Sequence, residues 1–146
     1  MENKIVEEIR SFNRFYTGLL GLLDNYLQQS AYTLPEARIL FELYHNDDLT
    51  ASNLIEILHI DKGYLSRLLR KFEKKKLIVR KRTNADNRVV VIALTPHGKT
   101  EFMALNRASH SQVTNSIKHL TTKDQKMLIE SMNKIKRLLE TKTSDI

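Results

Sequence analysis

Apolar residues recur every three or four positions along much of this chain, a spacing typical of amphipathic helices. The first such stretch runs from about residue 4 to residue 29 and predicts one long helix. Its apolar stripe consists of Ile5, Ile9, Phe12, Tyr16, Leu19, Leu20, Leu23 and Leu27. Thr33 and Glu36, with Pro35 between them, have the pattern of a capping box and predict a second helix to about residue 44. We expect four of its residues to face inward: Ala37, Leu40, Phe41 and Tyr44.

Two short helices are predicted after the polar break at residues 45–48. Thr50 is the expected cap of a helix over residues 51–58, and Asp61 is the expected cap of a helix from residue 62 to about 75. The tight turn between them completes the outline of a helix-turn-helix. The apolar stripe of the second helix of this pair consists of Leu65, Leu68, Leu69 and Phe72.

The periodicity changes beyond residue 76. Residues 77–82 and 89–94 are β-rich runs that flank a turn-rich tip, so they predict a β-hairpin. Thr95 and Pro96 then open a fifth helix to about residue 119, and Thr121 or Thr122 caps a sixth. The expected fold class is mainly α with a small β-hairpin wing (α+β), within a single domain over residues 1–146.

Composition narrows the class of protein further. The chain has 146 residues, of which 41% are hydrophobic, enough for one domain with a packed core. It has no cysteine, which excludes disulfides, thiolate metal sites, cysteine catalysis and redox sensing through a cysteine. Its longest apolar run, residues 89–94, is far shorter than the ~20 residues that span a bilayer. The five histidines lack a metal-ligand spacing. We expect a soluble cytoplasmic protein with no cofactor, no metal and no membrane association.

The net charge of +7 is unevenly distributed. Residues 62–88 contain eleven basic and two acidic residues, so this segment carries +9 and the rest of the chain carries −2. A basic chain binds nucleic acid, an anionic membrane or an acidic partner, or is simply well solvated. Concentration of the charge in one segment favours a specific anionic partner over general solubility.

The predicted helix from residue 62 presents its basic residues opposite its apolar stripe. At 100° per residue, Gly63, Arg67, Arg70 and Lys74 lie opposite the stripe, with Ser66 and Lys71 beside them. A major groove ~12 Å wide admits such a helix, where Arg67 or Arg70 would reach guanine. Lys62, Lys71 and Lys74 suit phosphates, as do the amides at the helix start near Thr50. An ordinary lysine-rich solvent face is the alternative interpretation.

The hairpin adds basic residues to the same side. It would bring Arg80, Lys81, Arg82 and Arg88 to that side, and its narrow arginine-bearing tip suits a minor groove. Asp86 lies two residues before Arg88 and would orient its guanidinium by a charge-assisted hydrogen bond, or would only form the turn.

The order of these motifs resembles the MarR family of winged-helix transcription regulators over essentially the whole chain. The resemblance is carried by Asp86-Asn87-Arg88, by Leu94-Thr95-Pro96-His97-Gly98, and by Ser66-Arg67 in the basic helix. It implies a winged helix-turn-helix lobe over residues 33–95 and dimerisation helices over residues 1–32 and 96–146. It also implies that Arg67 enters the major groove and Arg88 the minor groove. The full expected DNA-binding set is Thr50, Lys62, Gly63, Tyr64, Ser66, Arg67, Arg70, Lys71, Lys74, Lys81, Arg82, Asn84, Asp86 and Arg88.

Residues 11–17 and 34–38 further resemble the MarR half of proteins fused to a GNAT acetyltransferase, a half that is missing from this chain. The sequence departs from the family pattern in two places. Lys76 stands where many relatives end the recognition helix with glycine, and a left-handed lysine costs on the order of 1 kcal/mol, so a different helix end is expected. Gly63-Tyr64 replaces small hydroxyl residues, which affects base preference rather than binding mode.

A homodimer is expected from the length of the first helix. About 26 residues span ~39 Å, longer than a compact domain of this size covers, so the apolar stripe needs a second copy. Two recognition helices would then lie ~34–36 Å apart on a palindromic site. The resemblance also suggests a small-molecule effector where the dimer helices meet the lobe, although simple core packing explains the same residues. These candidates are Phe12, Tyr16, Tyr32, Arg38 and Phe41.

Other function classes fit the sequence less well. It has no phosphate-binding glycine loop, no nucleophile elbow and no His-Glu-x-x-His motif, so we expect no enzyme. A membrane-surface protein is disfavoured because the basic helix needs its apolar stripe for the core. The sequence therefore predicts a homodimeric, sequence-specific regulator of double-stranded DNA, most simply a repressor. The main alternative is a winged-helix interaction module or anti-repressor without sequence-specific DNA binding.

Overall fold

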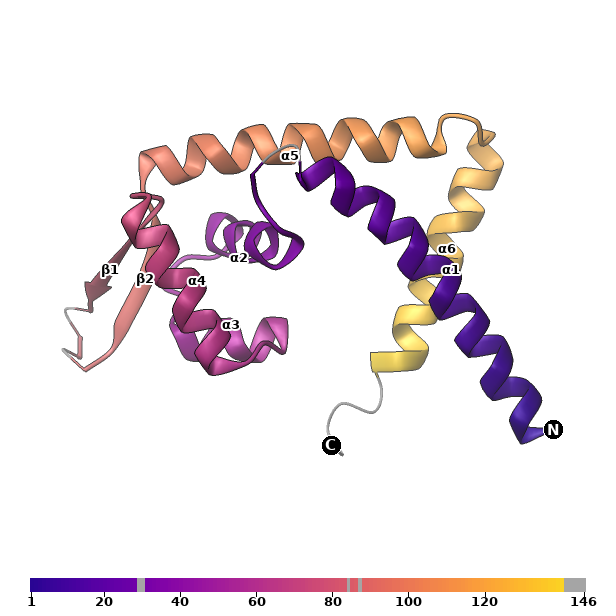
Figure 1. The fold of residues 1–146 in the computed structure, drawn as a ribbon, viewed down its shortest axis with the longest axis horizontal. Coiled ribbons are helices and arrows are strands. Elements are labelled where there is room, and N and C mark those ends of the chain that lie inside the picture. Colours follow the sequence, from indigo (N-terminus) through magenta and orange to yellow (C-terminus); the bar gives the residue numbers. More distant parts are fainter. Residues whose placement is uncertain (29–30, 84, 87, 141–146) are drawn as a thin grey trace. The chain divides into compact units, whose positions relative to one another are not determined.

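A computed structural model describes residues 1–28, 31–83, 85–86 and 88–140 of the chain. It divides into two compact units, residues 1–107 and residues 108–146. Figure 1 shows the elements in chain order. Their bounds are α1 Glu2–Gln28, α2 Leu34–His45, α3 Ala51–Leu58, α4 Lys62–Lys74, β1 Ile78–Arg82, β2 Val90–Leu94, α5 Pro96–Ile117 and α6 Thr122–Glu140. This is the mainly helical fold with one small hairpin that the sequence predicted.

The helix starts confirm the predicted caps. The Thr33 hydroxyl accepts from the amide of Glu36, whose carboxylate accepts from the amide of Thr33, so α2 begins with a full capping box. Thr50 forms the same reciprocal pair with Asn53 at α3. The Asp61 carboxylate caps α4 by accepting from the Tyr64 amide at 3.0 Å. Of the two candidates at α6, the cap is Thr121.

The core of the first unit lies between α2, α3, α4, the hairpin and the start of α5. The predicted stripe of α4 is confirmed, because its four apolar residues are all at most 7% exposed. The core residues are Tyr32, Ile39, Leu40, Leu43, Leu49, Leu54, Leu58, Leu65, Leu68, Leu69, Phe72, Leu77, Ile78, Ile92, Leu94, Phe102 and Leu105.

The inward face of α2 differs from the prediction. Leu40 is buried, but Phe41 and Tyr44 are 45% and 41% exposed. The buried stripe instead consists of Glu36, Ile39, Leu40 and Leu43. Phe41 and Tyr44 lie on the flank of this stripe, where their rings contact those of His45 and Phe102. The expectation for Phe41 and Tyr44 is therefore wrong, because the helix buries its aliphatic residues and Glu36 instead.

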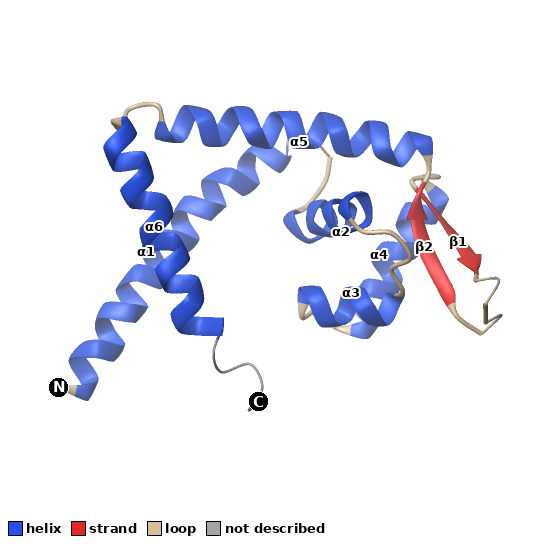
Figure 2. Cartoon of the chain, turned by 180° about the vertical axis from the view of Figure 1, so that it is seen from behind, coloured by secondary structure: helices blue, strands red, loops and turns tan. Residues whose placement is uncertain are grey.

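The hairpin is antiparallel, with Ile78 opposite Leu94 and Arg82 opposite Val90. Figure 2 shows the two strands beside α4, with their tip directed away from the helices. Leu49 extends the sheet by one bridge, because its carbonyl accepts from the Ile92 amide at 2.7 Å. The inner ends of the strands are buried, whereas the outer end of β1 is exposed and that of β2 is half-buried. The hairpin is therefore anchored at its base.

The structure contradicts the expectation that α4, with Lys76 in place of glycine, ends differently from the helix of its relatives. Lys76 adopts a left-handed conformation, with φ 58°. The Leu77 amide donates to the Phe72 carbonyl and the Lys76 amide donates to the Glu73 carbonyl, which is the hydrogen-bond pattern of a Schellman motif. The helix thus ends as it would with glycine. Burial of Leu77 directly after the cap, at 1% exposure, explains why the chain accepts the strained lysine.

The junction between β2 and α5 is held against the start of β1. The Thr95 amide donates to the Leu77 carbonyl at 2.9 Å, and the Thr95 hydroxyl donates to the Lys76 carbonyl at 2.6 Å. The same hydroxyl accepts from the Gly98 amide at the first turn of α5. A Cβ at Gly98 would lie 2.1 Å from the Leu77 carbonyl oxygen, so only glycine fits there. These contacts explain the Leu-Thr-x-x-Gly order that was recognised in the sequence.

The second unit contains the end of α5 and all of α6. The Gln125 side-chain amide donates to the carbonyls of Ile117 and Leu120, which holds the turn between the two helices. No residue of α6 is buried, and its apolar residues Met127, Ile129, Met132 and Ile135 are all at least 40% exposed.

We predict that Lys76→Gly raises the free energy of unfolding by about 1 kcal/mol. A left-handed conformation costs an L-residue about 1–2 kcal/mol, and glycine avoids this cost. Part of the gain is lost because glycine increases the conformational entropy of the unfolded chain. Urea denaturation of the two proteins measures the difference. Lys74→Gly removes the same charge from a helical position and should lower stability by about 0.5–1 kcal/mol. A loss of stability in Lys76→Gly would contradict the prediction.

Candidate nucleic-acid interface

The exposed face of α4 is basic from its first turn to its last. Burial of the opposite stripe fixes the rotation of the helix about its axis. Tyr64 and Ser66, also expected to contact DNA, are half-buried, and Tyr64 packs partly against the core. The other expected DNA-contacting residues on the helix are all exposed: Lys62, Gly63, Arg67, Arg70, Lys71 and Lys74. The structure therefore places most of the expected residues on one continuous face.

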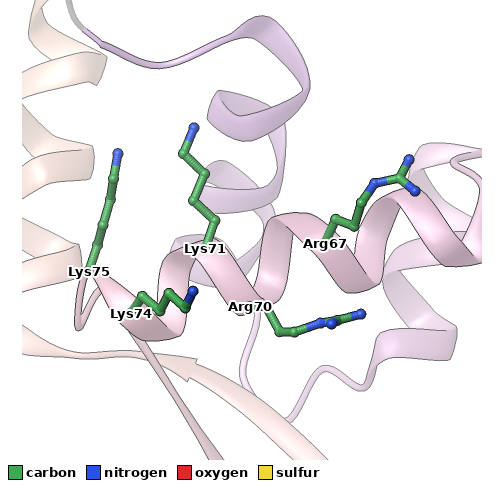
Figure 3. Close-up of a pocket in the computed structure, with 5 residues that line it drawn as sticks. All are labelled: Arg67, Arg70, Lys71, Lys74 and Lys75. Carbon is green, nitrogen blue, oxygen red and sulfur yellow. The ribbon is translucent and has the colours of Figure 1, made fainter.

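An open cavity of about 420 Å³ lies along this face. It is lined by five basic residues, four of α4 and its C-cap Lys75, all drawn in Figure 3: Arg67, Arg70, Lys71, Lys74 and Lys75. The Arg67 guanidinium lies over the Tyr64 ring, 5.7 Å from its centroid. An anionic ligand would meet only positive side chains there, and Arg67 and Arg70 present planar guanidinium groups suited to base edges and phosphates.

The wing places further basic side chains on the outer half of the hairpin. Lys81, Arg82 and Arg88 are exposed, and Arg88 is 96% so. The Asp86 carboxylate accepts from the Arg88 amide at 2.9 Å, whereas Arg88 Nε lies 3.9 Å away. The main role of Asp86 is therefore to stabilise the turn, together with two hydrogen bonds between Thr83 and the Asp86 backbone. Its ion pair with the Arg88 guanidinium is long and weaker than these hydrogen bonds. Asn84 and Asn87 lie outside the described residues.

Some of the positive charge in this segment is compensated within the protein. Arg80, on β1, forms an ion pair with Glu73 at the end of α4. This contact joins the recognition helix to the first strand of the wing. At the start of α3, Thr50 is half-buried, and the amides of Thr50 and Asn53 already donate to side-chain oxygens.

Glu36 is a buried carboxylate next to the basic face. Its side chain is 2% exposed, and its Oε2 lies 3.1 Å from Lys71 Nζ. Among the described residues, no donor forms a well-directed hydrogen bond with Oε2, so the Lys71 ammonium compensates it by charge. Burial by itself raises the pKa of Glu36, but Lys71 and the hydrogen bonds from Thr33 outweigh it. The net pKa therefore lies below 4.5, and Glu36 is ionised at neutral pH.

Tyr32 links α4 to α5 on the same side of the lobe. Its hydroxyl donates to Glu101 Oε2 at 3.0 Å, and Lys75 Nζ lies 5.5 Å from the centroid of its ring. Burial, together with the hydrogen bond to Glu101, raises the pKa of Tyr32 to about 12. The phenol is therefore a neutral hydrogen-bond donor at physiological pH.

The five expected effector residues do not line the cavity on α4. Phe12 and Tyr16 stack on α1 with ring centroids 5.7 Å apart. Arg38 is exposed, Phe41 contacts Phe102, and Tyr32 is engaged by Glu101 and Lys75. The position of an effector site in this chain stays a prediction.

Sequence reasoning missed the group formed by Glu36, Tyr32, Lys75 and Glu101. One signal was available for Glu36, because it continues the buried spacing of Ile39, Leu40 and Leu43 by one helical turn. The pairing of Tyr32 with Glu101, which is 69 residues away, had no local signal.

Within the described part of the chain, the structure brings no three histidine, aspartate or glutamate side chains together as a possible metal site. No helix over the same residues has the length and apolar character needed to cross a membrane.

The fold and this face define a winged helix-turn-helix, and comparison with known proteins places the chain within that class. A family model described as MarR family matches residues 32–90. The HTH-type transcriptional regulator SarZ of Staphylococcus epidermidis is 31% identical over 108 residues, which is 74% of this chain and 72% of SarZ. The chain belongs to the MarR family. Matches to other curated relatives span between 45% and 68% of the relative's length. These relatives are transcriptional regulators rather than enzymes.

Solved structures agree on the fold. A MarR family protein from Bacillus stearothermophilus superposes with a TM-score of 0.82 at 18% identity, covering 97% of this chain and 99% of that one. A variant of MepR from S. aureus, solved bound to an oligodeoxyribonucleotide, has a TM-score of 0.62 at 24% identity and covers 90% of this chain and 97% of its own.

We predict that Glu36→Gln lowers the free energy of unfolding by about 1 kcal/mol at pH 7, because it removes a charged contact and keeps the capping side chain. Since the folded pKa of Glu36 is lowered, its contribution is present above pH 4.5 and is lost as the pH falls through the lower folded value. The difference between the two proteins in urea should therefore shrink in acid.

Glu56→Gln, on the exposed surface of α3, controls for the loss of one carboxylate and should not reproduce this dependence. A difference between wild type and Glu36→Gln that grows as the pH falls from 7 to 3 would contradict the assignment.

Proposed function

We propose that this chain is a homodimeric transcriptional repressor that binds a palindromic site in double-stranded DNA through α4 and the wing. The observation that carries the proposal is the continuous basic face of α4, exposed opposite a fully buried apolar stripe. Membership of the MarR family supports the same function, and the MepR variant is one protein of this fold that was solved with DNA.

The positions of α4 and the wing support contacts with two different grooves of the DNA. The exposed first turns of α4 suit a major groove, with Arg67 and Arg70 reaching bases and Lys62 and Lys74 reaching phosphates. Arg88, at the narrow tip of the hairpin, suits the adjacent minor groove. Phosphate contacts give affinity and base contacts give sequence preference.

The exposed apolar residues of α1 support a dimer. Ile5, Ile9, Phe12, Phe15 and Leu19 are each at least 41% exposed, although they repeat at helical spacing. A row of exposed apolar side chains along one helix is typical of a surface that a second copy covers. The side chains of Leu23 and Leu27 lie outside those described. An effector that prefers one conformation of the dimer would release DNA by shifting the population away from the binding-competent state.

Selection on random duplex DNA with the full chain tests the function. Recovery of a palindromic motif, bound with an affinity that falls as salt rises, is the expected result. A protein that enriches no motif and ignores salt would instead be a winged-helix interaction module.

On the selected site, Arg67→Ala should cost about 1–3 kcal/mol of binding free energy and relax the preference at one base position. Lys74→Ala should weaken all sequences alike and flatten the salt dependence of binding. Fluorescence anisotropy with the selected duplex and with single-base variants measures both effects. Equal effects of the two changes on specificity would contradict the assigned face.

Ile9→Glu should raise the dimer dissociation constant at least tenfold, because a carboxylate would have to be buried in the interface. Arg14→Glu places the same side chain about 140° away around α1 and serves as the control. Sedimentation equilibrium measures both. An Ile9→Glu protein that dimerises as well as wild type would show that this stripe is not the interface.

A further inference from the structure

Four basic side chains of α4 and that of its C-cap, Lys75, line the same cavity, but they do not have the same surroundings. Figure 3 shows Lys71 and Lys75 extending on one side of the helix and Arg70 and Lys74 on the other. Lys71 and Lys75 are one turn apart, and each has an identified partner within the lobe. Lys71 lies against Glu36 of α2, and Lys75 lies over the Tyr32 ring.

Lys71 contacts a carboxylate that is buried and therefore desolvated. Glu36 is 2% exposed, and its other oxygen, Oε1, accepts from the Thr33 amide at 3.2 Å. A buried carboxylate needs a compensating charge, and its solvation is not recovered if that charge leaves. A DNA phosphate would therefore have to compete with Glu36 for the Lys71 ammonium. Lys74, which is exposed on the other side of α4, has no such competitor among the described contacts.

The second lysine connects this contact to α5. Lys75 lies over Tyr32, and the Tyr32 hydroxyl donates to Glu101 on α5. Tyr32 lies two residues before α2 and Glu36 lies in its first turn, so the two lysines hold one side of α4 to the same short segment. The orientation of α4 relative to α2 and α5 is thus set by charge as well as by apolar packing.

We propose that Lys71 and Lys75 are positioning residues of the recognition helix, and that Lys71 is withheld from DNA by Glu36 instead of contacting phosphate. The inference rests on the proposed DNA-binding function. On this proposal, the residues of α4 that neutralise phosphates and release counterions are Lys62, Arg67, Arg70 and Lys74. Glu36 then determines the number of positive charges on α4 that are available to DNA, because it pairs with Lys71.

The test uses the full chain and a 30-base-pair duplex of random sequence as the probe. The slope of log Kobs against log[KCl] reports the number of phosphates neutralised, about 0.9 for each contact. Lys71→Gln and Lys74→Gln remove the same charge from the same helix, one turn apart at most. We expect Lys74→Gln to flatten the slope by about 0.9 per subunit and Lys71→Gln to leave it unchanged.

The decisive variant is Glu36→Gln, which keeps the capping geometry and releases Lys71. Its slope should be steeper than that of wild type by up to about 0.9 per subunit, and Lys71→Gln in the same background should abolish the increase. A residue with only a structural role would not steepen the salt dependence. The urea midpoint should fall in Lys71→Gln, be restored in Lys71→Arg, and fall less when Glu36→Gln is added to Lys71→Gln.

A slope flattened equally by Lys71→Gln and Lys74→Gln would overturn the inference, as would an unchanged slope in Glu36→Gln. Failure of the proposed function has a different signature, because wild type itself would then show no salt-dependent binding. If Lys71→Gln does not fold, Glu36→Gln still decides the question through its slope.

Discussion

Burial of one side of α4 is the constraint on which the rest of the lobe depends. Leu65, Leu68, Leu69 and Phe72 lie at helical spacing and are almost completely removed from water. Each is worth about 1.5–3 kcal/mol, so together they are comparable with the ~5–15 kcal/mol that stabilises a typical domain. Rotation of the helix about its axis would forfeit this burial. The opposite side, which carries Arg67, Arg70 and Lys74, is therefore presented outward as a consequence of core packing.

Features that depend on neighbours in sequence were predictable. The caps at Thr33, Thr50 and Asp61, the stripe of α4 and the hairpin all follow from local spacing and local hydrogen bonding, and the structure confirms them. The interior of α2 was predicted less well, because Phe41 and Tyr44 compete with aliphatic residues for the same face. Propensity alone disfavoured the left-handed Lys76, but tertiary packing of Leu77 determines how that helix ends.

In the candidate site, too, features that depend on local spacing were predictable and contacts between distant residues were not. Spacing on α4 was enough to place its basic side chains on one face. It gave no information about which of them already have partners, because the partners of Lys71 and Lys75 are Glu36 of α2 and Tyr32, which precedes α2. Glu36 is distant in sequence from Lys71, and Tyr32 from Glu101. A count of charges over residues 62–88 thus overstates the charge that the lobe offers to solvent, since Lys71 is paired with Glu36, which lies outside that segment.

The peptide carbonyl of Leu77 joins three segments of the chain. It accepts from the Thr95 amide, it lies directly after the end of α4, and Gly98 of α5 packs against it without room for a Cβ. Both ends of the hairpin are therefore closed at its base, independently of its tip. Residues can be inserted, deleted or exchanged between Thr83 and Arg88 without displacing α4, since lengthening an exposed loop costs little entropy. Evolution can in this way adjust the wing while leaving the recognition helix untouched.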